Sequence, residues 1–217
     1  MRRTILLLST MALTLLVASG VALAVNKIGT NGPDTLRGTN EGDNLLGRGG
    51  NDALFGLGGS DNLLGEEGND WVLGGNEDEP QGGDKNLLGG PGNDGVLGGL
   101  GSDNMLGGEG GDLLVDDGFR EFSKDVLSGG SGNDVIDAWH KPAAAQDVVT
   151  CGSGFDRVIA DKADLVAPDC EKVVVVHGSL DDNFRQADRW FESLPPSLGE
   201  EFFETLFEEH LAPFPNG

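Results

Sequence analysis

The chain of 217 residues contains no tyrosine and few basic residues, with 14 lysines and arginines against 37 aspartates and glutamates. Its net charge of −23 excludes duplex nucleic acid as a partner, because the phosphate backbone would repel it. The chain also lacks an HExxH zinc motif, a GxSxG nucleophile elbow and a phosphate-binding loop. Its histidines, His140, His177 and His210, have no metal-ligand spacing and are interpreted as surface residues. We therefore expect that the protein is not an enzyme.

Long hydrophobic runs are scarce as well. The main one, at residues 5–17, follows Arg2 and Arg3 and is short for a membrane span. The tripeptide at residues 22–24, Ala-Leu-Ala, fits a small-x-small cleavage site. We expect residues 1–24 to be a signal peptide, and the mature chain to begin at Val25 and to be secreted to the extracellular space without a membrane span.

Glycine is the residue that the chain has in excess, with 37 copies. Together with the acidic charge, this composition is compatible with a disordered, solvated segment. The order of the residues favours a folded repeat instead. Residues 47–73 read GRGGNDALF, GLGGSDNLL and GEEGNDWVL, three nonapeptides that start with glycine and carry aspartate at the sixth position and an apolar residue at the eighth.

This nonapeptide pattern recurs along most of the chain. The aspartates are spaced by nine residues from Asp34 through Asp43, Asp52, Asp61 and Asp70, then at Asp94, Asp103 and Asp112, and with insertions at Asp125, Asp134, Asp147 and Asp156. The apolar positions are Leu36, Leu45, Leu54, Leu63, Val72, Leu87, Val96, Met105, Leu114, Leu127, Ile136, Val149 and Val158. Internal repeats of this kind are typical of solenoid folds.

These residues resemble the nonapeptide GGxGxDxUx of the hemolysin-type (RTX) calcium-binding repeat proteins, over residues 29–159. The resemblance implies an all-β solenoid, a right-handed parallel β-roll with two strands per coil. It also implies several Ca²⁺ ions per chain, each between loops one coil apart. The implied ligands are Asp34, Asp43, Asp52, Asp61, Asp70, Asp94, Asp103, Asp112, Asp134 and Asp156. The alternative is that these aspartates only form turns.

Elementary energetics supports the calcium interpretation. Two buried aliphatic side chains per coil do not offset the conformational entropy lost when two nonapeptides become ordered. Stacked carboxylates would repel one another, whereas Ca²⁺ between them prefers six to eight oxygen ligands. We therefore expect folding to be coupled to calcium binding, with calcium ions as the principal partners.

Alternate loops should lie on opposite edges of the roll, and the two edges differ. The regular edge has six-residue loops that end at Asp34, Asp52, Asp70, Asp94, Asp112, Asp134 and Asp156. The irregular edge carries every insertion, and at residues 74–85 Lys85 falls where aspartate is expected, with Asp84 shifted by one. We expect up to six calcium sites on the regular edge and one on the irregular edge, between Asp43 and Asp61.

The two cysteines, Cys151 and Cys170, lie 19 residues apart, close to one coil of the repeat. Residues one coil apart are within disulfide reach, and an even pair outside the cell is more often bridged than free. We expect a disulfide that crosslinks the last loop to the segment that follows it. The alternative is that one cysteine is a reactive thiol.

The roll should occupy residues 25–176 and end with a strand at 173–176. Residues 177–217 are predicted to be a C-terminal amphipathic helical segment that caps the roll. Alternatively, this segment or the inserted loops bind a cell-envelope or protein partner. The competing function is a structural or adhesive surface protein that uses the roll as a calcium-stiffened spacer, and an enzyme accessory is a third.

Overall fold

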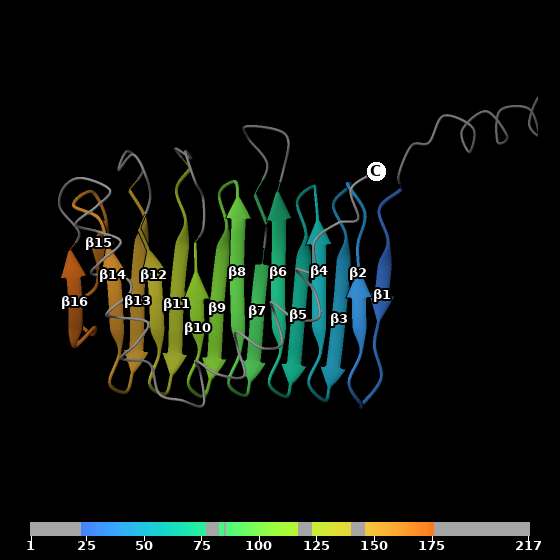
Figure 1. Cartoon of the computed structure of the whole chain (residues 1–217), viewed down its shortest axis with the longest axis horizontal. Coiled ribbons are helices and arrows are strands. Elements are labelled where there is room, and N and C mark those ends of the chain that lie inside the picture. Colours follow the sequence, from blue (N-terminus) through green and yellow to red (C-terminus); the bar gives the residue numbers. More distant parts are fainter. Residues whose placement is uncertain (1–22, 77–82, 85, 117–122, 140–145, 176–217) are drawn as a thin grey trace, which may run out of the picture. The chain divides into compact units, whose positions relative to one another are not determined.

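The computed structural model describes residues 23–76, 83–84, 86–116, 123–139 and 146–175 (Figure 1). Within these ranges the chain forms sixteen β-strands and no helix, so none of the described segments could cross a membrane as a helix. The expected signal peptide, apart from Leu23 and Ala24, most of the inserted segments and the predicted C-terminal helices lie outside the described residues.

The strands form two parallel sheets, and consecutive strands alternate between them. The first sheet contains β1 (Asn26–Ile28), β3 (Asn44–Gly49), β5 (Asn62–Glu67), β7 (Asn86–Pro91), β9 (Asn104–Glu109), β11 (Val126–Ser131), β13 (Val148–Ser153) and β15 (Leu165–Val166). The second contains β2 (Thr35–Arg37), β4 (Ala53–Leu57), β6 (Trp71–Asn76), β8 (Gly95–Leu100), β10 (Leu113–Val115), β12 (Val135–Ala138), β14 (Arg157–Ala160) and β16 (Lys172–Val175). The all-β parallel solenoid expected from the repeat is therefore confirmed.

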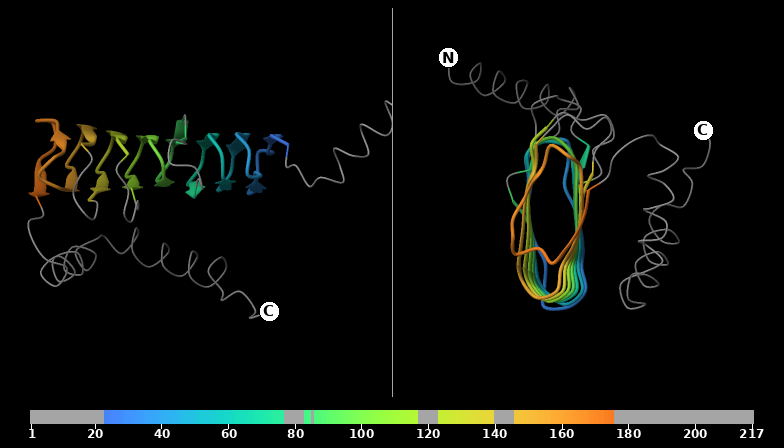
Figure 2. Two further views of the ribbon diagram at one scale, coloured as in Figure 1. Left: turned by 90° about the horizontal axis from the view of Figure 1, so that it is seen from above. Right: turned by 90° about the vertical axis from the view of Figure 1, so that its left-hand side faces the viewer.

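Each coil pairs in register with the coils on either side of it. Leu45 pairs with Leu63, and Leu63 pairs with Leu87, although an insertion separates the second pair by six more residues. Seen along the roll, successive coils superpose as a flattened oval (Figure 2). The insertions therefore leave the stacking of the strands unchanged.

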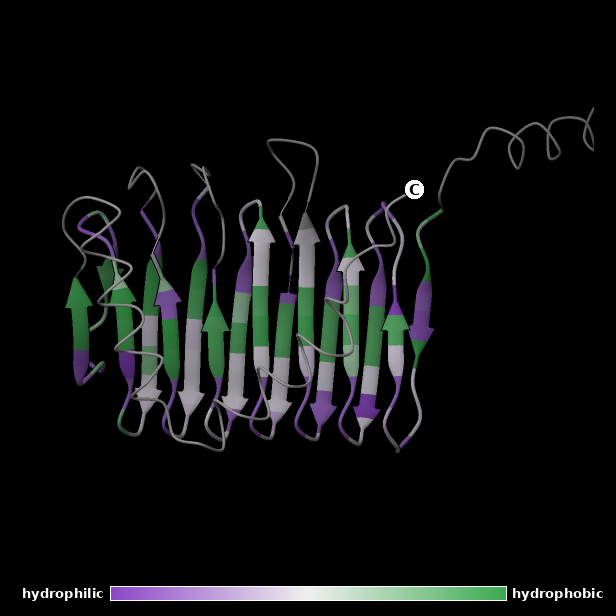
Figure 3. Cartoon of the chain, in the orientation of Figure 1, coloured by the Kyte–Doolittle hydropathy of each residue, from purple (hydrophilic) through white to green (hydrophobic). Residues whose placement is uncertain are grey.

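The core lies between the two sheets and consists mainly of one aliphatic side chain per strand, to which Ala138, Cys151 and Ala160 add a second on the last strands. The eighth residue of each nonapeptide, from Leu45 to Val158, is at most 1% exposed. Only Leu36, next to the N-terminal end of the roll, is half-buried. Hydrophobic segments accordingly recur on the strands of both sheets (Figure 3). Because side chains alternate along a strand, the seventh and ninth residues point outward.

Many strands extend beyond the seventh to ninth residues of the nonapeptide, because pairing continues into the first half of the following loop. Arg48 and Gly49, at the second and third loop positions, pair with Glu66 and Glu67 of the next coil. Loops of the same length and conformation stack in register, so their backbone groups extend the ladder of hydrogen bonds. The loops of the regular edge therefore form one continuous surface of stacked turns.

The C-terminal end of the roll also agrees with expectation. β16 ends the second sheet at Lys172–Val175, where the last strand was predicted at residues 173–176. Cys151 and Cys170 form a disulfide, with their Cα atoms 5.2 Å apart. This bond fastens the last loop of the regular edge to the segment between β15 and β16.

Candidate metal centre

The loop aspartates of the regular edge form a ladder of carboxylates along the roll. The backbone N–H of each aspartate donates to Oδ1 of the aspartate one coil further on, as from Asp52 to Asp70 and from Asp94 to Asp112, at 2.7 to 2.9 Å. From Asp52 onward each side chain is at most 1% exposed. One oxygen of each carboxylate is therefore used to join neighbouring loops.

The second carboxylate oxygen of most loop aspartates, on both edges, is buried without a hydrogen bond. This holds for Oδ2 of Asp52, Asp61, Asp70, Asp84, Asp94, Asp112, Asp134 and Asp156. A buried polar atom without a hydrogen bond costs about 1–3 kcal/mol, and more when it is charged. A repeated cost of this size indicates that these oxygens have a partner other than a protein donor.

The surroundings of Oδ2 show what kind of partner fits. A Cβ added at Gly47, the first residue of its loop, would lie 2.7 Å from the carbonyl oxygen of Gly65 and even closer to Oδ2 of Asp52. A carboxylate oxygen and a carbonyl oxygen from the next loop thus face the same small space. The same pair of oxygens meets the Cβ position at Gly29, Gly38, Gly56, Gly65, Gly74, Gly107 and Gly129. Converging carboxylate and carbonyl oxygens are the donor set of Ca²⁺.

Glycine also allows the loops to approach one another so closely. Gly92, at the fourth loop position, has φ of +156°, and a Cβ there would overlap the carbonyl oxygen of Gly68 in the neighbouring loop. Gly110, Gly132 and Gly154 meet the preceding loop in the same way. The repeat glycines therefore bring the backbone oxygens of neighbouring loops within reach of a shared ion.

Burial makes these carboxylates hard to ionise without a cation. It is the largest cause that raises the pKa of Asp94 to about 7 and the pKa of Asp112 to about 8. The N–H of the preceding aspartate lowers each pKa, and the charge of a neighbouring aspartate raises it again. Burial likewise raises the pKa of Asp61, Asp70 and Asp134 to about 6. Two positive charges from Ca²⁺ would remove this cost.

The irregular edge carries a second ladder, which is more complete than the sequence suggested. Asp84 accepts the N–H of Asp61 at 2.7 Å and donates its own N–H to Asp103 at 2.6 Å. Asp84 is 2% exposed, and burial raises its pKa to about 7. The assignment of Lys85 to the aspartate position was therefore wrong. The ladder begins at Asp43, which accepts the N–H of Val25, and it is not broken after Asp61.

Further along, the irregular ladder continues through residues that do not follow the repeat. Asp103 donates its N–H to Asp125, Asp125 to Asp147, and Asp147 to Asp164. Asp125 and Asp147 are at most 1% exposed. The loops that end at these two aspartates have insertions and no repeat glycines, yet their carboxylates keep their places in the ladder. The loss of the motif in the loop therefore does not remove the carboxylate.

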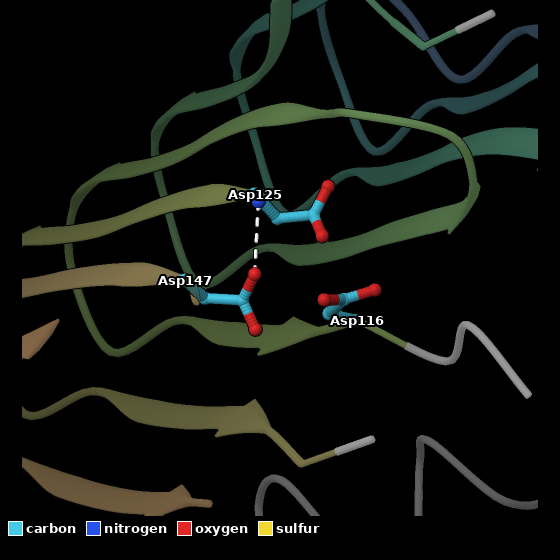
Figure 4. Close-up of side chains that lie close together, drawn as sticks. All are labelled: Asp116, Asp125 and Asp147. Atoms are coloured by element: carbon cyan, nitrogen blue, oxygen red, sulfur yellow. Dashed lines mark hydrogen bonds between the residues drawn. The ribbon is translucent and has the colours of Figure 1, made fainter. Parts of the chain in front are cut away.

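Three carboxylates of this edge gather into one cluster, formed by Asp116, Asp125 and Asp147 (Figure 4). One oxygen from each lies within 4.8 Å of the others, and each side chain is at most 2% exposed. Asp116 comes one residue after Val115, which pairs with Leu97, so it holds the register position of a first loop glycine. An extra carboxylate thus stands where the other loops of this edge have glycine or alanine. Such a group could hold one metal ion.

The comparison with protein families agrees with this geometry. The family model of the RTX calcium-binding nonapeptide repeat matches in four copies, at residues 28–63, 55–78, 82–114 and 123–139. The chain belongs to the RTX calcium-binding repeat proteins. None of the curated proteins compared with it matches. The RTX repeats imply that the ladders bind calcium.

All ten aspartates predicted as RTX ligands lie in one of the two ladders. The structure brings Asp34, Asp52, Asp70, Asp94, Asp112, Asp134 and Asp156 together on the regular edge, and Asp43, Asp61 and Asp103 on the other. The prediction omitted Asp84, Asp125 and Asp147 because insertions disturb the motif around them. Asp116 was missed as well, although an acid two residues after a core leucine, in place of an RTX glycine, is a visible signal.

Proposed function

We propose that this protein is an exported, non-enzymatic calcium-binding module whose roll folds when Ca²⁺ ions fill both carboxylate ladders. One observation carries the proposal. Buried Oδ2 atoms without hydrogen bonds face carbonyl oxygens of the next loop, at spaces that only glycine leaves open. Without cations, the folded state would hold these oxygens unpaired in the protein interior, which is costly for charged groups.

Coupled folding follows from the same burial. The unfolded chain hydrates its carboxylates, whereas the folded chain buries them, so ion binding stabilises only the folded state. The sequence carries a net charge of −23, which expands the unfolded chain through self-repulsion. With extracellular calcium as the source, dissociation constants on the order of 10⁻⁴ to 10⁻³ M are expected for Ca²⁺.

A calcium titration of the mature protein tests this function. In excess chelator, far-ultraviolet circular dichroism is expected to show little β-structure, and Ca²⁺ is expected to produce the β-roll cooperatively. Mg²⁺ at the same concentration serves as the control, because it demands octahedral geometry and retains its water. A chain that is already β-rich in chelator and takes up no Ca²⁺ would refute the proposal.

We extend the expected ion count beyond the regular edge. The irregular ladder is continuous from Asp43 to Asp164, so more than the single site between Asp43 and Asp61 is expected there. The cluster of Asp116, Asp125 and Asp147 is a candidate for one of these ions. Native mass spectrometry of the calcium-loaded protein should therefore count more ions than the six expected between the loops of the regular edge.

Export is tested independently of calcium. Expression in a host with an intact general secretory pathway should release a product that begins at Val25, as N-terminal sequencing would show. Retention of residues 1–24 in the folded protein would contradict the proposed signal peptide.

A partner for the roll is also a proposal. The chain passes from the second sheet to the first at each of the three insertions, so all three fall in loops of the irregular edge. A cell-envelope or protein partner that binds there would make the roll a calcium-stiffened spacer. Pull-down with envelope fractions, with and without Ca²⁺, separates that role from calcium binding alone.

A further inference from the structure

The last loop of the regular edge, residues 151–156, is covered by a segment that does not belong to the repeat. Asp169 accepts the N–H groups of Cys151 at 3.5 Å and Gly152 at 3.0 Å. Glu171 accepts the N–H of Asp156 at 2.9 Å. Two carboxylates from residues outside the nonapeptides therefore lie against this loop.

Glu171 accepts the hydrogen bond that, at every earlier loop of the regular edge, is accepted by an aspartate. There, the N–H of each loop aspartate donates to the carboxylate of the next aspartate, as from Asp134 to Asp156. The N–H of Asp156 donates to the carboxylate of Glu171 instead. The regular ladder thus continues one step beyond the last repeat, through a longer acidic side chain.

Asp156 has a buried carboxylate oxygen that could bind an ion between the last loop and Glu171. Its side chain is 0% exposed, its Oδ1 accepts the N–H of Asp134, and its Oδ2 has no hydrogen-bond partner. Burial raises the pKa of Asp156, and the charges of Glu171 and Asp169 raise it further, against the N–H of Asp134. The hydrogen bond from Asp156 to Glu171, and those from Cys151 and Gly152 to Asp169, place both acids against the loop that ends at Asp156.

The direction of this oxygen follows from the other loops. In each of them, Oδ2 of the aspartate faces the first residue of its own loop, a glycine. Gly152 and Gly154 keep positive φ, as in the loops before, so the last loop has the same conformation. Its first residue is Cys151, which is bonded to Cys170, the residue between Asp169 and Glu171. Oδ2 of Asp156 therefore points toward the end of the loop that the disulfide ties to the two acids.

We propose that Asp156, Asp169 and Glu171 form a terminal Ca²⁺ site, and that the Cys151–Cys170 disulfide positions the two non-repeat acids over the last loop. The inference rests on the proposed function, because it adds an ion to the end of the same ladder. The site differs from those between repeats in that its outer half comes from a segment held by a covalent bond.

Conservative variants of the oxidised mature protein test the site. Glu171→Gln keeps an oxygen that can accept the N–H of Asp156 but removes the charge. Asp169→Asn also removes the charge, but its single amide oxygen can keep only one of the two contacts, because Cys151 and Gly152 donate to different oxygens of Asp169. The control is Glu109→Gln, an exposed acid on another loop of the same edge. Native mass spectrometry at saturating Ca²⁺ counts the bound ions, and circular dichroism checks that each variant is folded.

Glu171→Gln and Asp169→Asn are each expected to bind one Ca²⁺ fewer than the wild type, while Glu109→Gln binds the same number. The double variant Cys151→Ser with Cys170→Ser should lose the same single ion. Unchanged counts in both acidic variants would overturn the terminal site, and an unchanged count in the cysteine variant would overturn the role of the disulfide. A wild type that binds no Ca²⁺ would instead contradict the proposed function itself.

Discussion

Lowering the pH should restore order to the calcium-free protein. The relevant groups are the buried ladder aspartates, whose folded pKa values are about 6 for Asp61 and Asp70, about 7 for Asp84 and Asp94, and about 8 for Asp112. Their value in an unfolded chain is 3.8. Between pH 4 and 8 the folded state therefore binds more protons than the unfolded state, and the free energy of unfolding falls as the pH rises.

The size of this effect decides the outcome. Each unit of pKa difference corresponds to about 1.4 kcal/mol, so Asp94 alone destabilises the metal-free roll by a few kcal/mol above pH 7. Several such groups together amount to on the order of 10 kcal/mol, which is comparable with the entire stability of an ordinary domain. At pH 8 without calcium the roll should be unfolded, and protons should replace calcium ions as the pH falls.

Circular dichroism in excess chelator between pH 8 and pH 5 measures this directly. The range stops above the isoelectric point of about 4.1, where loss of net charge promotes precipitation. β-Structure is expected to increase as the pH falls through the window from about 8 to 6. Asp94→Asn, which mimics the protonated carboxylate, should shift the transition to higher pH, whereas Glu109→Gln should not. A calcium-free protein that is fully ordered at pH 8 would refute this reasoning.

Other predictions concern single positions. Gly92→Ala should weaken calcium-induced folding by more than about 1 kcal/mol, because its φ is +156° and a Cβ would overlap the carbonyl oxygen of Gly68. The matched control is Gly32→Ala, whose Cβ would meet only the Thr30 hydroxyl at 3.9 Å. Equal midpoints of the two variants in a calcium titration would contradict the packing argument. Asp116→Gly, which restores the repeat, should reduce the ion count in native mass spectrometry by one while the roll still folds. An unchanged count would exclude Asp116 as a ligand. Chelation of the loaded wild type at pH 8 should unfold the roll reversibly, and persistence of its β-signal would contradict coupled folding.

Much of the architecture could be predicted from the sequence because the repeat is short and regular. One apolar residue per nonapeptide, such as Leu63 or Val96, could point only inward in a strand between loops of fixed length. The same spacing assigned each loop aspartate to one edge, and it placed Cys151 one coil from Cys170. These inferences needed only local periodicity, since each coil contacts just its neighbours.

The prediction was wrong or incomplete for residues whose place in a ladder depends on how the folded loops stack, and not on their position in the nonapeptide. Lys85 was assigned because it lies two residues before the core residue Leu87, but Asp84 meets Asp61 and Asp103 instead. Glu171 lies in a segment with no repeat at all and joins the regular ladder only because the chain folds back over the last loop.

The sequence by itself determined the coil, the core positions and the kind of ion, because each of these follows from a period of nine residues and from the chemistry of aspartate and glycine. Only the tertiary structure decided which carboxylates of the irregular edge meet. Asp116, Asp125 and Asp147 are separated by insertions that no period describes. The parallel pairing of β11 with β13 in one sheet, and the position of β10 in the other, place them together in space.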